Sequence, residues 1–412
     1  MKLKIFEKLG IYNYWIFTIE MERGHMKKRK LSMGIMMISL LLVSCGHNNK
    51  TVFNGEISGT NDLEQTQAYF LEGMHEVAKC PTGYYYMEET QTTTADLLKY
   101  YDDAAGESIV LCNKPQCEHD SKECMAYIDM SEYKPRLYYY NSSLYMIRMN
   151  GDMERISTDG TERTVLGNIC NSGSSDTVYV SFNGNTAYVS REIEEVSGDV
   201  IAEIFAFNLE TGNSSKVFSE TAHGLGIASL RTYAGSTYFV KIEISRDDND
   251  IYSVVSDGLY RIEGDNVQLV MNDNIYEFCI DSEQSNLYYS KLDDSGIYVY
   301  NTGSGEKRKI YDNESGNSFT ITYDGEYIWM DDTQYKSMSR YVNKQMEELN
   351  YTIYQLSKDG ELIAKRVVPD SEKIFAILHG DKTKMFMFSL NKDSIIYIDK
   401  ENIEHGEIKE LK

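Results

Sequence analysis

The sequence lacks any long stretch in which apolar residues recur at helical spacing, and this absence excludes an ordinary helical fold. It also lacks a hydrophobic run of the ~20 residues that a membrane-spanning helix needs. Three catalytic signatures are absent as well: Gly-x-Ser-x-Gly, His-Glu-x-x-His and the phosphate-binding loop. The sequence therefore points to no particular reaction. Its informative features concern where the chain is located and how it is built.

Basic residues are scarce compared with acidic ones. The chain holds 41 Lys and Arg against 64 Asp and Glu, a formal net charge of −23. Residues 1–44 contribute eight of the basic and three of the acidic residues, so the remainder carries a net charge near −28. A surface of this sign repels nucleic acid and anionic lipid headgroups. Nucleic-acid partners are therefore excluded.

Residues 26–45, MKKRKLSMGIMMISLLLVSC, have the layout of an export signal. A positive segment at 27–30 precedes a short apolar stretch at 31–44, which suits the hydrophobic region of a signal peptide. The final letters LVSC resemble the lipobox of bacterial lipoproteins. This resemblance implies that residues 26–44 are removed and that Cys45 is acylated. The lipid would then hold the protein to the outer face of the cell membrane.

The segments around this leader predict the remaining organisation. Residues 1–25 fit no signal pattern, and we expect a misplaced start or a disordered extension there. Residues 45–72 are polar and aperiodic, which is typical of a flexible tether. Residues 73–412 are expected to form a single folded domain.

The chain is rich in tyrosine, which provides 33 of the 412 residues, and tyrosine favours strands. Short alternating strands recur, and tight turns close each set at Gly106, Gly160, Gly212, Gly264, Gly305, Gly360 and Asn402. A spacing of about 40 to 55 residues with four strands per unit is typical of β-propeller blades. We therefore predict an all-β fold of seven four-stranded antiparallel blades, with six or eight blades as the alternatives.

Individual units support this prediction. In the second unit, strands are expected at Arg136–Tyr140, Ser143–Met149, Met153–Thr158 and Glu162–Leu166. Blades packed around a channel bury their faces against one another, and tyrosine rings suit such half-buried positions. One short helix is predicted at Met338–Asn350, where apolar residues recur at helical spacing. Trp329 is the only tryptophan after residue 45, so the tryptophan ring of quinone-binding propellers is missing.

The stretch VLCNKPQCEHDSKECMAY at residues 110–127 concentrates thiol and metal-ligand groups. Cys112, Cys117, His119 and Cys124 fall within thirteen positions. Haem attachment needs the spacing Cys-x-x-Cys-His, which is absent here. Four nitrogen or sulfur ligands suit a tetrahedral zinc site, and a site with four protein ligands leaves no position open for catalysis.

Two further interpretations of this loop stay open beside zinc or another soft metal. A disulfide between Cys124 and either Cys112 or Cys117 would close a short loop, and Cys80 is an additional candidate partner for Cys112. Free thiols with a structural or redox role are the remaining alternative. We expect the loop to connect the first and second blades, on one face of the propeller near the channel mouth.

The lipobox, the tyrosine-rich blades and the cysteine loop together resemble propeller lipoproteins of Gram-positive gut and soil anaerobes. The resemblance spans the chain from Cys45 onward. Its most specific residues are Cys112, Pro115, Cys117, His119, Asp120 and Cys124. It implies an exported, lipid-anchored propeller, and it brings neither a catalytic residue nor a ligand.

Three hypotheses of function follow. The first is a non-catalytic, extracytoplasmic propeller that binds a protein or glycan partner at the cell surface. The second is an enzyme, either a glycosidase or a polysaccharide lyase, with carboxylates lining the channel. The third is a metal- or redox-responsive surface sensor that uses Cys112, Cys117, His119 and Cys124. The fold does not decide among them, because propellers host many functions.

Overall fold

The computed structural model describes residues 77–411, apart from residues 91–94, 130–134, 149, 171–175, 247–251, 265, 282, 293, 314–318, 333–349, 370–372, 390–391 and 393. All of the described residues belong to the compact unit Val52–Lys412. The predicted leader, Cys45, the tether and residues 338–349 of the predicted helix lie outside the described residues.

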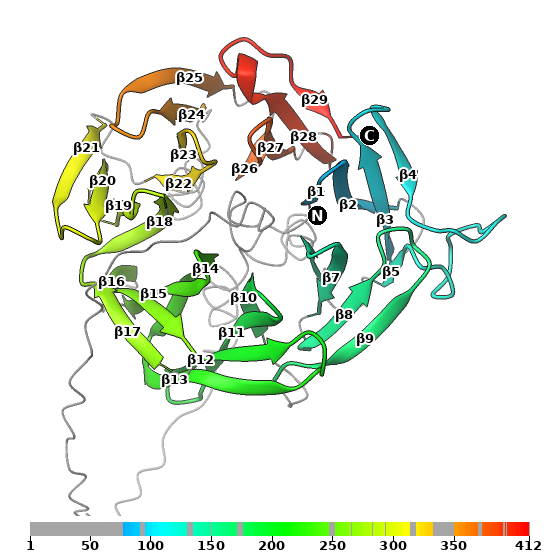
Figure 1. The fold of residues 1–412 in the computed structure, drawn as a ribbon, viewed down its shortest axis with the longest axis horizontal. Coiled ribbons are helices and arrows are strands. Elements are labelled where there is room, and N and C mark those ends of the chain that lie inside the picture. The colour runs from blue at the N-terminus through cyan, green and yellow to red at the C-terminus, as the bar shows by residue number, and fades with distance from the viewer. Residues whose placement is uncertain are drawn as a thin grey trace, which may run out of the picture. The chain divides into compact units, whose positions relative to one another are not determined.

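Seven antiparallel sheets are arranged as the blades of a propeller (Figure 1). Blade 1 contains β1 (Val77–Cys80), β2 (Gly83–Glu89), β3 (Ala95–Asp102), β4 (Glu107–Val110) and an additional strand, β5 (Tyr127–Asp129). Blade 2 contains β6 (Arg136–Tyr140), β7 (Ser143–Ile147), β8 (Asp152–Ile156) and β9 (Arg163–Asn168). Blade 3 contains β10 (Asp176–Asn183), β11 (Thr186–Glu194), β12 (Asp199–Asn208) and β13 (Ser214–His223).

The remaining blades follow the same order, with the first strand innermost and the fourth at the outer edge (Figure 1). Blade 4 contains β14 (Leu225–Tyr233), β15 (Ser236–Arg246), β16 (Tyr252–Glu263) and β17 (Asn266–Met271), and blade 5 contains β18 (Ile275–Asp281), β19 (Asn286–Lys291), β20 (Gly296–Asn301) and β21 (Lys307–Asp312). Blade 6 contains β22 (Thr320–Tyr323), β23 (Ile328–Asp331), β24 (Tyr351–Leu356) and β25 (Leu362–Val368), and blade 7 contains β26 (Ile374–His379), β27 (Lys384–Ser389), β28 (Ser394–Asp399) and β29 (Lys409–Glu410).

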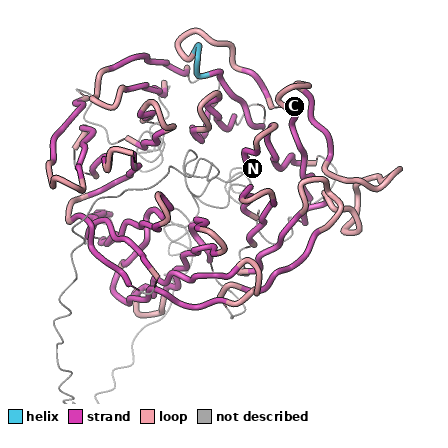
Figure 2. Tube along the Cα trace, in the orientation of Figure 1, coloured by secondary structure: helices cyan, strands magenta, loops and turns pink. Residues whose placement is uncertain are grey.

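Strands account for nearly all of the regular structure (Figure 2). Within the described ranges, the only helical turn is the short 3-10 segment η3 (Lys400–Asn402). No helix in this part of the chain is long and apolar enough to cross a membrane.

The prediction of seven four-stranded blades is confirmed. In blade 2, every strand end lies within two residues of its predicted position. The turn glycines predicted from the sequence have left-handed backbone angles, for example φ 67° at Gly160 and 69° at Gly212. A Cβ atom at Gly160 would lie only 2.8 Å from the carbonyl oxygen of Leu111 in blade 1, so this turn requires glycine for its conformation and for its packing.

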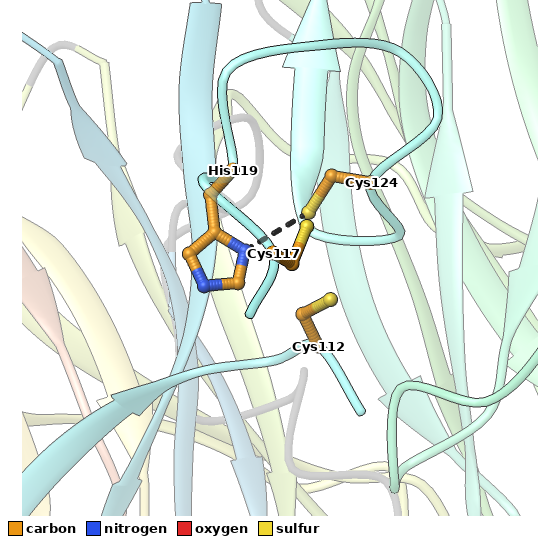
Figure 3. Close-up of side chains that lie close together, drawn as sticks. All are labelled: Cys112, Cys117, His119 and Cys124. Carbon is orange, nitrogen blue, oxygen red and sulfur yellow. Dashed lines mark hydrogen bonds between the residues drawn. The ribbon is translucent and has the colours of Figure 1, made fainter. Parts of the chain in front are cut away.

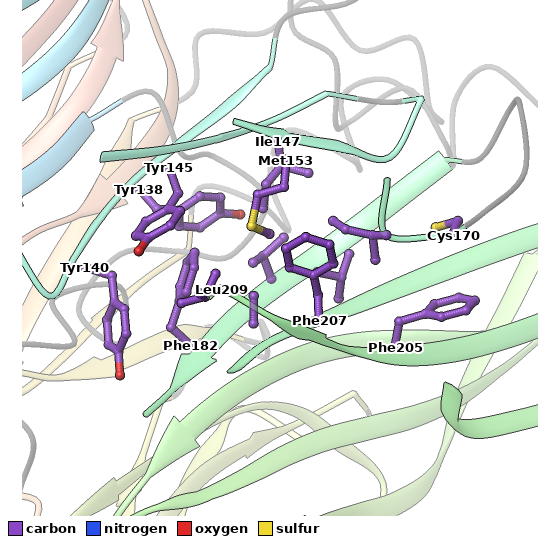
Figure 4. Packing of buried hydrophobic residues seen from close by; sticks show 14 residues of the cluster. Tyr138, Tyr140, Tyr145, Ile147, Met153, Cys170, Phe182, Phe205, Phe207 and Leu209 are labelled. Carbon is purple, nitrogen blue, oxygen red and sulfur yellow. The ribbon is translucent and has the colours of Figure 1, made fainter. Parts of the chain in front are cut away.

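The hydrophobic core lies between neighbouring blades. The cluster between blades 2 and 3 centres on the fully buried ring of Phe182, which lies 5.5 Å from the ring of Tyr138 and 5.0 Å from that of Tyr140 (Figure 4). Further clusters join blades 1 and 2, 3 and 4, 4 and 5, 5 and 6, and 6 and 7. Tyrosine rings therefore supply contacts between blades, as the sequence predicted.

Each of these two sheets is built from consecutive strands, β1–β5 in blade 1 and β26–β29 in blade 7, and no described strand of one pairs with a strand of the other. Blades 1 and 7 therefore contact each other through side chains. The buried Tyr84 hydroxyl donates a hydrogen bond to Asp381, and the Tyr84 ring packs edge-to-face on Phe386 at 5.0 Å. Lys384 pairs with Asp103 at 2.7 Å. We refer to this set of contacts between blades 1 and 7 as the closing seam.

Candidate metal centre

The outer strand of blade 1 is split into two pieces, and the cysteine loop is inserted between them. β4 pairs with the second half of β3 and β5 pairs with its first half, both antiparallel. At the junction, Leu98 donates its N–H to the carbonyl of Ala126 and accepts the N–H of Leu111. Leu111 and Ala126 thus share one position of the ladder. Residues 112–125 form a loop that leaves and re-enters the sheet at that position.

This arrangement corrects the predicted location of the loop. The sequence prediction placed it between blades 1 and 2 near the channel mouth, but it lies at the outer edge of blade 1 (Figure 1). The physical reason is that Tyr127–Asp129 pairs back with Ala95–Leu97 before the chain crosses to blade 2. Ile128, which is fully buried, anchors this return.

Blade 2 supports the base of the loop. The guanidinium of Arg163 donates a hydrogen bond to the carbonyl of Tyr127 at 3.0 Å and pairs with the buried carboxylate of Glu154. The hydroxyl of Tyr85 donates to the carbonyl of Thr158 at 3.0 Å, next to the Gly160 turn that packs on Leu111. Both ends of the loop are therefore fixed to rigid strands, which favours a precise side-chain arrangement between them.

The loop brings together the four residues that the sequence singled out. One side-chain ligand atom from each of Cys112, Cys117, His119 and Cys124 lies within 4.8 Å of the others (Figure 3). His119 approaches through Nδ1, which lies 3.2 Å from Sγ of Cys124. Cys124 is buried, whereas the other three are partly exposed. We call this group the Cys3His cluster.

Tight turns create the cluster from a short segment. The N–H of Cys117 bonds to the carbonyl of Lys114 at 3.3 Å, and the N–H of Cys124 bonds to that of Ser121 at 2.9 Å. His119 adopts a left-handed backbone with φ 59°, an uncommon conformation for a residue other than glycine. Such strain is retained where the surrounding structure needs the side chain to point in one direction.

Backbone N–H groups also point at two of the sulfur atoms. Burial alone would raise the pKa of Cys112, but hydrogen bonds from the backbone N–H groups of Lys114 and Met125 and from the neighbouring thiols of Cys124 and Cys117 together hold that pKa below its ordinary value. Burial raises the pKa of Cys124 to about 11, against the N–H bond from Ala126. Donors that face thiolate sulfur are the outer contacts by which proteins orient and stabilise metal ligands.

The cluster fits a tetrahedral soft metal. Zinc bonds cysteine sulfur at about 2.3 Å, which places the sulfurs of a tetrahedral site about 3.8 Å apart. The observed limit of 4.8 Å between ligand atoms requires side-chain movements of only about 1 Å to reach that geometry. Four protein ligands complete the coordination, so a metal held here would have a structural role.

The thiols of the described residues are not joined to one another. No disulfide is formed by Cys80, Cys112, Cys117, Cys124, Cys170 or Cys279. Cys80 does not belong to the Cys3His cluster, and its sulfur contacts the hydroxyl of Thr82 at 3.7 Å. Metal binding, a disulfide within the loop, and free thiols with a structural or redox role are the three alternative predictions for the cysteines of this loop.

A second polar cluster, which the sequence did not predict, lies between blades 6 and 7. His379 is fully buried, with Nε2 2.7 Å from the carboxylate of Asp331 and Nδ1 3.0 Å from the hydroxyl of Thr322. Asp331 and Thr322 belong to blade 6 and His379 belongs to blade 7, so no local sequence pattern predicts their contact. Because all three side chains are buried, this cluster links blades rather than meeting a substrate.

The chain matches no protein-family model, and no curated protein matches its sequence. Many solved structures share its fold. An oligogalacturonate lyase from Vibrio parahaemolyticus is 11% identical, with a TM-score of 0.48 over 88% of this chain and 89% of that chain. An oligogalacturonate lyase in complex with manganese is also 11% identical, with a TM-score of 0.46 over 88% of each chain. BamB from Moraxella catarrhalis is 9% identical, with a TM-score of 0.40 over 82% of this chain and 97% of that chain. At these identities the similarity extends to the fold alone.

Proposed function

We propose that this protein is an exported, lipid-anchored β-propeller that binds a partner at the cell surface without catalysing a reaction. In this proposal the Cys3His cluster holds a structural zinc ion, and the ordered loop around it forms part of the contact surface. The observation that carries the proposal is the Cys3His cluster itself. It offers four protein ligands, enough to complete a tetrahedral zinc site, and it lies on a loop that interrupts the outer strand of blade 1 at a single position.

The position of the cluster favours a binding role over a catalytic one. A zinc ion with four protein ligands has no free coordination site for a substrate or an activated water. The loop lies at the outer edge of blade 1, opposite the innermost strand β1, which faces the centre of the propeller (Figure 1). Zinc binding would supply the free energy that orders a segment with few buried side chains of its own.

The exposed residues of the loop favour a protein over a glycan as the partner. Apart from Pro115, they are polar or charged and of both signs, and they include Lys114, Glu118, Asp120, Lys122 and Glu123. None of the exposed residues between 112 and 125 is aromatic, so the loop offers no ring on which a sugar could stack. Mixed charges instead suit the polar rim of a protein interface.

Support for export and anchoring comes from the sequence pattern that ends at Cys45. The test is cell fractionation of the wild type and of Cys45→Ser, with the full-length chain expressed in a bacterium that acylates lipoproteins. We expect the wild type in the detergent phase of membranes and the variant in a soluble exported or unprocessed form. Equal membrane association of both would contradict anchoring through this cysteine.

The binding role is tested by site-specific photo-crosslinking in intact cells. A photoreactive residue replaces the exposed Glu118 in the loop, and a matched control replaces the exposed Glu306 in the blade 5 turn. We expect a discrete crosslinked protein from position 118 only, and its loss in a Cys112→Ser background that no longer holds zinc. Strong hydrolase or lyase activity on a polysaccharide panel, unchanged in that background, would contradict the proposal.

A further inference from the structure

We propose that the Cys3His cluster is an oxidant-operated switch, in which Cys112 and Cys117 form a disulfide and the zinc ion leaves. This inference rests on the proposed zinc site and adds its regulation. It requires thiols that are close together, reachable by a small oxidant, and held where their rearrangement does not unfold the propeller. The structure meets each of these three conditions.

All three thiols of the cluster are close enough to pair, and their exposure to solvent selects Cys112 and Cys117. The sulfurs of Cys112 and Cys117 lie within 4.8 Å of each other, and a disulfide needs 2.05 Å, so rotation of two short side chains has to supply less than about 3 Å of movement. Both cysteines are partly exposed, whereas Cys124 is only 3% exposed. A small oxidant therefore reaches the first two sulfurs and leaves Cys124 as the remaining thiol.

The chemistry needs a two-electron oxidant of the hydroperoxide class. The thiolate of Cys112 attacks one peroxide oxygen, which forms a sulfenic acid and releases hydroxide. The thiolate of Cys117 then attacks that sulfur, the S–S bond forms, and a second hydroxide leaves. In total, two thiolates lose two electrons and the peroxide is reduced to two water molecules with two protons from solvent. Zinc loses two of its four ligands and dissociates.

The split strand confines the change to the loop. Leu98 holds Leu111 on one side of the insertion and Ala126 on the other, and both bonds belong to the sheet rather than to the cluster. Contacts from Arg163 fix the returning strand as well. Oxidation therefore alters residues 112–125 while the blade stays intact, and the surface proposed to contact a partner changes shape.

The test begins with the full-length chain, purified without a metal-binding tag and loaded with one equivalent of zinc. Hydrogen peroxide is added stepwise while a chromogenic chelator reports released zinc, denatured aliquots report free thiols, and far-ultraviolet circular dichroism reports the fold. We expect one zinc ion released for every two thiols lost, with an unchanged circular dichroism spectrum. A thiol reductant followed by zinc should restore the original metal content.

Variants assign the residues. Peptide mapping of the oxidised wild type should show a Cys112–Cys117 linkage, and Cys80→Ser, which removes a thiol outside the cluster, should behave like the wild type. In Cys124→Ser the same disulfide should form although zinc binding is lost or weakened, because the oxidisable pair is retained. In Cys117→Ser no intramolecular disulfide should form.

The possible failures are distinguishable. Protein that binds zinc and keeps it in excess peroxide would overturn the switch and leave the structural zinc site standing. Protein that binds no zinc under reducing conditions would overturn both. A disulfide that includes Cys124, or zinc release accompanied by loss of the β-sheet spectrum, would overturn the confined rearrangement proposed here.

Discussion

Deleting residues 112–126 should leave a folded propeller that binds no zinc. The deletion joins Leu111 directly to Tyr127. In the variant, Leu111 alone can supply the N–H and the carbonyl that bond to Leu98, which in the wild type come from Leu111 and Ala126 respectively. The N–H of Leu111 already donates to Leu98, and its carbonyl replaces that of Ala126 as the acceptor. The ladder of blade 1 therefore loses no hydrogen bond.

The expected cost comes from two buried side chains. Cys124 is 3% exposed and Ala126 is fully buried, and both pack in the cluster between blades 1 and 2. At roughly 0.8 kcal/mol for each buried methylene-sized group, their loss lowers the free energy of unfolding by about 2 kcal/mol. The shorter connection offsets part of this cost, because less chain has to be ordered on folding.

Urea unfolding measures this difference in a Trp15→Phe background, where the buried Trp329 of blade 6 is the single tryptophan reporter. The reference is the zinc-free wild type, because a ligand that binds only the folded state adds its own stabilisation. The full-length Cys112→Ser variant serves as the matched control for loss of metal alone. If the deletion abolishes cooperative unfolding while Cys112→Ser preserves it, the blade needs the loop in order to fold. The interpretation that the loop is an insertion at a single position of the strand would then be wrong.

Two further predictions concern charged groups. Asp381→Asn removes the carboxylate that accepts the Tyr84 hydroxyl and backbone N–H groups in the closing seam, and it should cost about 2 to 4 kcal/mol of unfolding free energy. Tyr84→Phe should cost only about 1 kcal/mol, because Asp381 keeps its other donors; equal urea midpoints for these two variants would contradict this. At Asp273, burial opposes the charge, but Lys307 and Lys291 prevail and lower its pKa to about 2. Its folded pKa lies below the unfolded value near 3.9, so about 2 kcal/mol of stabilisation is present above roughly pH 4 and is lost as pH falls toward 2. Asp273→Asn should flatten this part of the pH profile of urea midpoints, and an unchanged slope would refute the assignment.

The sequence predicted the blades because each blade is encoded locally. Alternation along strands such as Arg136–Tyr140 and the left-handed glycine of a turn such as Gly160 lie within one unit, so their pattern can be read without tertiary contacts. The four members of the Cys3His cluster were predicted for the same reason, since they fall within one short segment.

Features that depend on distant partners were not predicted. β5 has only three residues, too few for a strand pattern, and its pairing with Ala95–Leu97 exists because β3 has a free edge there. The predicted position of the loop near the channel was wrong on this account. The contact between Asp331 and His379 likewise joins residues of two different blades. The number of residues between them in the sequence gives no indication that they meet.

The closing seam has a mechanical consequence. A pulling force applied through the residues that precede β1 enters the propeller at the innermost strand of blade 1, beside blade 7. Other neighbouring blades are joined by covalent connections as well as by packing, whereas the described contacts across the seam are side-chain contacts such as Tyr84 with Asp381 and Lys384 with Asp103. Under load this seam is the line along which the ring would part first, and a single-molecule extension trace should show blade 1 separating before the other blades.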